Sequence, residues 1–133
     1  MYSKLRAACY ELDRLREITR DENETLERLM ARATSTGGSS YGDELPRGSH
    51  TGDKLERAAI DLAEYKTEIK KARRLRTPIR AAALSRIWRE LDDGAAYVAE
   101  AIHDRGLNYK EIAAESGYSV RWVYLQDEKV RRV

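Results

Sequence analysis

The residues best suited to chemistry lie in one C-terminal segment, residues 107–133, with the sequence LNYKEIAAESGYSVRWVYLQDEKVRRV. The pattern E-I-A-A-x-x-G-Y-S-x-R-x-V within it is typical of two short helices joined by a tight turn, in which a small Ala113 lets the helices approach. Such a helix-turn-helix can place the N-terminal face of its second helix in the major groove of DNA. The chemistry expected here is recognition by binding.

The two helices are bounded by residues that suit helix ends. Asn108 is a good N-cap for a helix over 109–116, and Ser119 for a second helix over 120–130. Gly117 supplies the left-handed conformation that the turn requires. We expect inward-facing side chains at Ile112, Ala113, Val123 and Val130, with Tyr118 as a plug in the turn.

Arg121 is the strongest candidate for contact with a base edge or a phosphate, because it lies in the first turn of the second helix. Ser119 is chiefly a cap, and packing is the favoured role of Trp122. Basic side chains at the edges of the motif suit phosphates, which receive most protein–DNA hydrogen bonds. The candidate DNA-binding residues are Tyr109, Lys110, Ser119, Arg121, Trp122, Tyr124, Leu125, Lys129, Arg131 and Arg132.

The charge of the 133-residue chain is unevenly distributed. Residues 94–133 carry six basic and six acidic side chains, which is a weakness for DNA affinity because counterion release contributes much of it. Residues 70–89 carry eight basic side chains and no acidic one. This basic block is either a solvated helix face or a contact for a polyanion.

Other kinds of site find little support. Cys9 is the only cysteine, and no apolar run approaches the length of a membrane span, so we expect a cytoplasmic protein without disulfides. His50 and His103 lack partners for a zinc site. No nucleophile–base set, acid pair or phosphate-cradling loop stands out, so we expect no enzyme activity, no cofactor and no metal.

The segments before the motif predict long helices. Residues 1–32 form a coiled-coil-like segment with heptad rows, as one helix or two in tandem, because residues 19–25 are polar enough to fray or break it. Residues 33–52 form a Gly/Ser-rich linker. Residues 53–76 form a second long helix, capped by Thr51 or Asp53. Two apolar stripes joined by a loop indicate an antiparallel hairpin, or dimerisation through the same faces.

The remaining residues, 77–133, form the expected helix-turn-helix domain. Thr77-Pro78 indicates a boundary, because proline favours the first position of a helix. We expect helices over 78–91 and 95–104, with Gly106 as a C-terminal cap. Since no apolar alternation persists, the chain is predicted to be all-α, with an N-terminal hairpin or coiled coil followed by a helix-turn-helix cluster.

Residues 108–130 resemble the fourth region of bacterial sigma factors. Residues 41–133, about two-thirds of the chain, resemble small bacteriophage regulators of the ArpU/RinA type, which have this sigma-like end. The residues that carry the likeness are Gly42-Asp43, the helix 55–69, Leu107–Ala113 and Gly117–Tyr124. One departure concerns the last helix, where the family has an apolar residue at the position of Gln126 and a polar, base-reading residue at that of Leu125.

The resemblance implies a phage or prophage regulator of late or lysis-type genes. It would bind promoter double-stranded DNA, and its N-terminal helices would mediate self-association or contact with RNA polymerase. A small terminase subunit, which recognises phage DNA for packaging, is an alternative that a ring of many subunits would favour. A helical protein-interaction module is another, favoured by failure to bind any duplex.

Overall fold

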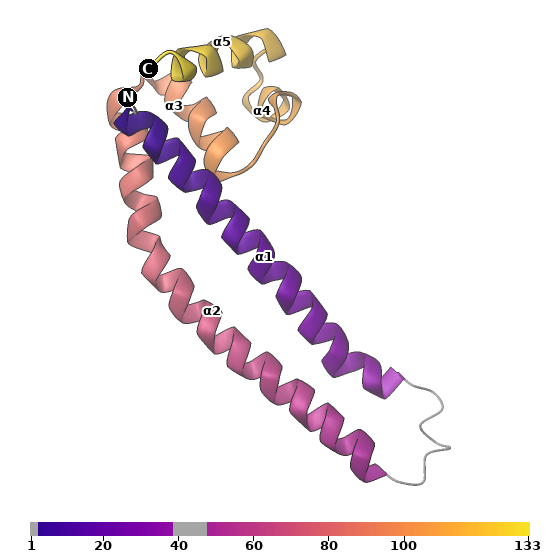
Figure 1. Cartoon of the computed structure of the whole chain (residues 1–133). Helices are drawn as coiled ribbons and strands as arrows, with labels where there is room; N and C mark the ends of the chain where they lie inside the picture. Colours follow the sequence, from indigo (N-terminus) through magenta and orange to yellow (C-terminus); the bar gives the residue numbers. More distant parts are fainter. Residues whose placement is uncertain (1–2, 39–47) are drawn as a thin grey trace. The chain divides into compact units, whose positions relative to one another are not determined.

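The computed structural model describes residues 3–38 and 48–133, and these residues form helices and short connections without a strand. The predicted all-α class is therefore confirmed. Among the described residues, no helix is both long and apolar enough to cross a membrane. In chain order the elements are α1 (Lys4–Gly38), α2 (Gly48–Glu90), α3 (Asp93–Ala99), a π-helix η2 (Glu100–Asp104), α4 (Tyr109–Ser116) and α5 (Val120–Arg131) (Figure 1).

The chain folds into two compact units. Unit 1 comprises Met1–Ile18 and Arg76–Val133, and unit 2 comprises Thr19–Leu75. Both units contain part of α1 and part of α2, which run in opposite directions within each unit (Figure 1). Within each unit the two helices are therefore antiparallel, one of the two arrangements that the apolar stripes allow.

Unit 2 pairs the two stripes and includes an ion pair whose carboxylate is buried. Ala58 and Ile69 are buried, and Glu22, at a seam position of α1, is also buried. The guanidinium of Arg73 lies 3.2 Å from the Glu22 carboxylate and donates to the side chain of Asn23 at 2.8 Å. Of the two alternatives for this segment, one helix or two in tandem, the structure has the first, because α1 is continuous through residues 19–25 and the guanidinium compensates the buried carboxylate.

The expected linker is shorter than its composition indicates. Residues 33–38 belong to α1, and residues 48–52 belong to α2, so Thr51 and Asp53 lie inside α2 and do not cap its start. Residues 39–47, which include Gly42, Asp43 and Pro46, lie outside the described residues. Glycine and serine weaken a helix by only about 0.5–1 kcal/mol each, so a few of them do not by themselves end a helix.

The predicted helix boundary at Thr77-Pro78 is also wrong, because α2 continues through Pro78. A proline inside a helix leaves the carbonyl four residues earlier without its usual donor. Pro78 and Arg74 are both exposed, so water can hydrogen-bond to that carbonyl. Buried residues follow the proline at Ala83 and Ile87, and their packing against α1 holds the helical course.

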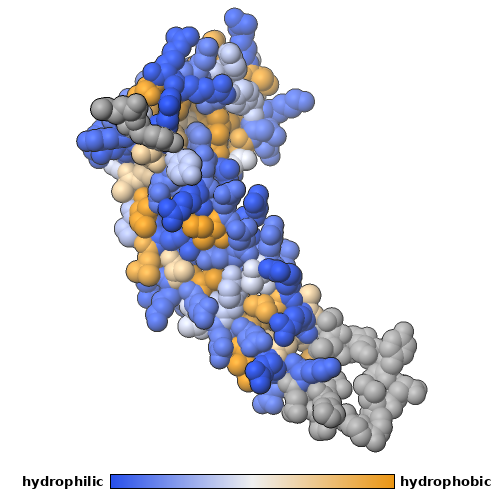
Figure 2. All heavy atoms as spheres, viewed as in Figure 1, coloured by the Kyte–Doolittle hydropathy of each residue, from blue (hydrophilic) through white to orange (hydrophobic). Residues whose placement is uncertain are grey.

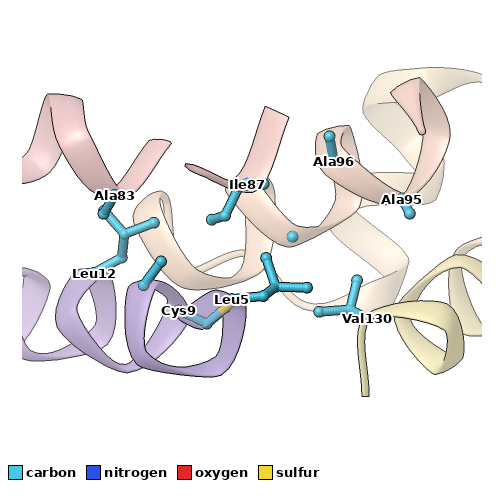
Figure 3. Packing of buried hydrophobic residues seen from close by; sticks show 10 residues of the cluster. Leu5, Cys9, Leu12, Ala83, Ile87, Ala95, Ala96 and Val130 are labelled. Carbon is cyan, nitrogen blue, oxygen red and sulfur yellow. The ribbon is translucent and has the colours of Figure 1, made fainter. Parts of the chain in front are cut away.

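The core of unit 1 joins α1 and α2 to α3 and α5. Leu5 and Leu12 from α1 pack with Ile87, Ala96 and Val130 (Figure 3). Small alanines at 83, 95, 96 and 99 line the contacts and allow the helices to approach closely. Cys9 is buried in the same cluster, and its burial and the nearby Asp13 raise the pKa of its thiol to about 11.

A second cluster supports the C-terminal helices. Val98, Ala101, Ile112 and Val123 are almost completely buried together, which joins α3, η2, α4 and α5. The expected helix over 95–104 is present as α3 followed by η2. Gly106 follows with a φ of +71°, and its N–H donates to the Ile102 carbonyl at 3.1 Å, as expected for a glycine after a helix end.

Candidate nucleic-acid interface

Helix α4 begins and ends at the predicted residues. The Asn108 side chain accepts from the Glu111 N–H at 2.8 Å, and the Glu111 carboxylate accepts from the Asn108 N–H at 2.9 Å. This reciprocal pair is a capping box. Gly117 has a φ of +81°, and no atom lies within 4 Å of the position of an added Cβ. The glycine is therefore required by backbone conformation and not by crowding.

Helix α5 follows directly and divides into two faces. The Ser119 hydroxyl accepts from the Trp122 N–H at 3.1 Å, which confirms the predicted cap. The inner face consists of Val123, Gln126, Asp127 and Val130, all buried. The outer face of its first two turns consists of Val120, Arg121, Tyr124 and Leu125, all exposed. Helical periodicity separates these two sets, so the first turns present one continuous surface to solvent.

The predicted cations fall into two groups. Arg121 and Lys110 are exposed and form no ion pair among the described residues. The others have carboxylate partners within unit 1. Their closest N–O distances are 3.2 Å for Lys129–Asp92, 2.7 Å for Arg131–Asp127 and 3.6 Å for Arg132–Glu128. Only the first group offers a positive charge without breaking an existing pair.

A hydrogen-bonded triad fixes the start of α4 against α5. The Tyr109 hydroxyl donates to the buried Asp127 carboxylate, and Arg131 donates to Asp127 at 2.7 Å and to the Tyr109 oxygen at 2.8 Å. Burial and the nearby Asp127 carboxylate raise the pKa of the Tyr109 hydroxyl. Tyr109 and Arg131 are therefore structural partners in this arrangement. The sequence reading missed Asp127, although its spacing of four from Arg131 is a helical ion-pair signal.

The turn between α4 and α5 carries an aromatic stack. The rings of Tyr118 and Trp122 are 4.1 Å apart between centroids, with an interplanar angle of 16°. Trp122 is half-buried and also packs on the second core cluster, in agreement with its favoured packing role. Tyr118 is 57% exposed, so its predicted role as a plug is wrong. The turn is filled by Trp122, and Tyr118 covers that ring from the solvent side.

Glu115 connects α4 to the preceding elements. Arg105 donates to both of its carboxylate oxygens, at 2.6 Å to the first, and the Tyr97 hydroxyl donates to it at 2.8 Å. The hydrogen bonds from Arg105 and then Tyr97 lower the pKa of the Glu115 carboxyl to about 2. These contacts fix the connection that presents α4 and α5.

We expect Glu115→Gln to lower the melting temperature near neutral pH and to have no effect in strong acid. The carboxyl pKa is lower in the folded chain than its ordinary value of 4.5, so ionisation stabilises the fold above that value. This contribution is lost as the pH falls from 4.5 towards about 2. Thermal melts of both proteins across this range test the prediction. Glu56→Gln, at an exposed glutamate of unit 2, is the control, and equal shifts for both variants would contradict it.

Gln126 occupies the position that the sigma-like pattern fills with an apolar residue. Its side chain is buried, and its Oε1 has no hydrogen-bond partner among the residues that the structure describes. Leu125 is exposed, on the outer face of α5.

Replacing Gln126 with the similarly shaped Met should stabilise unit 1 by about 1 kcal/mol, because an unsatisfied buried polar group is removed. Urea denaturation monitored by circular dichroism measures the change. Gln126→Glu is the matched control and should destabilise, since it buries a charge at the same place. A lower free energy of unfolding for the Met variant would show that the amide contributes to stability.

The basic block 70–89 is partly neutralised by acidic residues outside it. Arg80 donates to both oxygens of Asp104 at 2.7 Å, Arg73 pairs with Glu22, and Arg86 lies 3.6 Å from Glu90. Lys70, Lys71 and Arg74 are exposed and form no ion pair among the described residues. Hydrophilic side chains cover most of the face seen in Figure 2. The available charge is smaller than the sequence count indicates.

Comparison with known protein families, curated proteins and solved structures finds no significant match for this chain. Within the described residues, no group of three or more histidine, cysteine or acidic side chains is placed to hold a metal ion. The surface of α4 and α5 is the part of the molecule that bears on function.

Proposed function

We propose that this protein is a sequence-specific DNA-binding regulator of phage or prophage transcription, in which α5 enters the major groove. The observation that carries the proposal is the capped start of α5, with Arg121 exposed and unpaired beside a continuous outer face. Recognition helices of helix-turn-helix proteins contact base edges with residues of this N-terminal half. The activity is binding, with no covalent chemistry.

The support for α5 comes from how firmly it is held. Its inner face is buried, its start is capped by Ser119, and Asp127 connects it to α4. A rigid element positions a binding side chain better than a loop does. Arg121 thus projects from a fixed helix, and Lys110 is an unpaired cation at the start of α4.

The modest supply of unpaired cations favours assistance from a second subunit or from RNA polymerase. The stripes of α1 and α2 pack against each other within each unit, so self-association would use other residues, such as the exposed Ile60 of unit 2. Sedimentation equilibrium of the full chain measures the number of subunits. A dimer suits a regulator with paired half-sites, whereas a ring of many subunits would favour the packaging protein.

The direct test is a mobility-shift assay with duplex fragments of the source genome at low and high salt. A fragment retained in preference to its competitors, with affinity that falls as salt rises, supports the proposal. Absence of a shift with any duplex at low salt contradicts DNA binding by the isolated chain. The same assay with added RNA polymerase tests recruitment.

The contribution of the basic block has its own test. Replacing Lys70, Lys71 and Arg74 with alanine should weaken binding to all sequences and reduce the slope of log affinity against log salt by about one for each cation that contacts a phosphate. The control replaces Lys54, Arg57 and Lys66, which are exposed on unit 2, with the same change in charge. An equal response of the two triple variants would show that the block acts only through net charge.

A protein-interaction role is the second candidate, and one groove favours it. A hollow of about 520 Å³ between α3, α4 and α5 is lined by the rings of Tyr97, Tyr118 and Trp122 and by the carboxylate of Asp93. Aromatic faces beside a carboxylate suit a lysine or arginine side chain of a protein partner. Quenching of Trp122 fluorescence by an arginine-rich peptide, in a Trp88→Phe background and lost with Asp93→Asn, would support this role.

A further inference from the structure

The outer face of α5 is unusually apolar for a surface that contacts DNA. Val120, Tyr124 and Leu125 are 45%, 45% and 43% exposed, and Arg121 is the only charged side chain among them. Three large hydrophobic residues on one exposed face suggest a binding surface, because water is a poor environment for them. The apolar atoms therefore need a counterpart in whatever α5 binds.

These side chains lie together and point away from the core. Positions 120, 121, 124 and 125 share one face of a helix with 3.6 residues per turn. The ring of Tyr124 is edge-on to Tyr109, with centroids 6.3 Å apart and an interplanar angle of 72°. Tyr109 is itself held by Asp127, so this side of the face is fixed. Val120 and Leu125 have no side-chain donor or acceptor.

The major groove offers one apolar group on the edges of unmodified bases, the C5-methyl of thymine. Donors and acceptors account for the other groups of that edge, and aliphatic side chains cannot pair with them. Arg121, which lies between Tyr124 and Leu125 around the same face, suits the O6 and N7 acceptors of guanine. The chemistry of the face thus distinguishes thymine from cytosine by its methyl group.

We propose that Val120 and Leu125 read thymine methyl groups, beside a guanine contacted by Arg121. This inference rests on the proposed DNA-binding function and specifies what that function recognises. It predicts a preferred site in which thymines flank a guanine. Removing one contacted methyl should weaken binding about fourfold, as expected for one methylene-sized group returned to water.

The experiment first selects a preferred duplex from a random pool with the full chain. Each thymine of that duplex is then replaced in turn by deoxyuridine, which keeps the hydrogen-bonding edge and lacks only the methyl. Affinities are measured by fluorescence anisotropy for the wild-type chain, Val120→Ala and Leu125→Ala. Leu75→Ala is the matched control, because it removes the same atoms from a leucine that is 72% exposed on unit 2.

The expected result is a loss of about fourfold at one or more thymines in the wild-type chain, absent in Val120→Ala or Leu125→Ala at the corresponding position and retained in Leu75→Ala. Equal affinity for thymine and uracil duplexes would overturn the methyl-reading inference and leave DNA binding in place. A methyl effect that persists in both α5 variants would also overturn the assignment. Failure to retain any duplex would refute the proposed function itself.

Discussion

Ile112→Ala should destabilise unit 1 by about 2–5 kcal/mol, which is a large share of the stability of a small domain. Ile112 is the only residue of α4 that is fully buried, and it packs with Val98 and Val123. A helix as short as α4 does not persist in water by itself, so its order depends on this contact. Thermal and urea denaturation of the variant measure the loss.

The matched control is Ala114→Gly, at an exposed position on the same helix. It should cost at most about 1 kcal/mol, because only helix propensity changes. If the two variants lose similar amounts, α4 is held by its caps and not by its buried isoleucine. Because α4 supports α5 through Asp127, we also expect Ile112→Ala to reduce DNA binding at temperatures where the variant is partly unfolded.

Arg121→Ala should weaken binding to the preferred duplex by about 1–3 kcal/mol, or roughly 5- to 150-fold, if its guanidinium makes a bidentate contact with a guanine. Binding to unrelated duplexes should change much less, because one contact between a cation and a phosphate is a small part of non-specific affinity. The ratio of the two dissociation constants, measured at one salt concentration, separates these effects.

Two further variants sharpen this test. Arg121→Lys keeps the charge but cannot form the forked contact, so it should lose most of the specificity and retain the salt dependence. Arg132→Ala removes a cation that is already paired with Glu128, and it should have a smaller effect on specificity. Unchanged affinity of Arg121→Ala for its preferred site would exclude Arg121 from the reading face.

The sequence predicted the C-terminal helices well because their ends are determined locally. Asn108, Gly117 and Ser119 act on backbone groups within three or four residues, and the structure confirms the role of each. The hydrophobic period also identified Ile112 and Val123 as buried. Local capping and periodicity are the features that a single sequence expresses most directly.

What the sequence did not reveal depends on contacts between distant residues. Two ion pairs partly neutralise a block that has no acidic residue of its own. One joins Arg80 to Asp104, and the other joins Arg73 to Glu22. Continuation of α2 through Pro78 likewise depends on packing against α1, which overrides the local preference. The DNA-binding roles of Arg121 and Lys110 remain predictions, because exposure shows availability and not contact.

The core of unit 1 has a consequence for the order of folding. Leu5 and Val130 belong to one cluster, although almost the whole chain separates them. Closing so long a loop is entropically costly, and contacts between distant residues slow folding. Residues 19–75 can pair as a hairpin before the last helix has left the ribosome, and this pairing shortens the loop that Leu5 must close. We therefore expect the N-terminal turns of α1 to dock last in the nascent chain, when α5 becomes available.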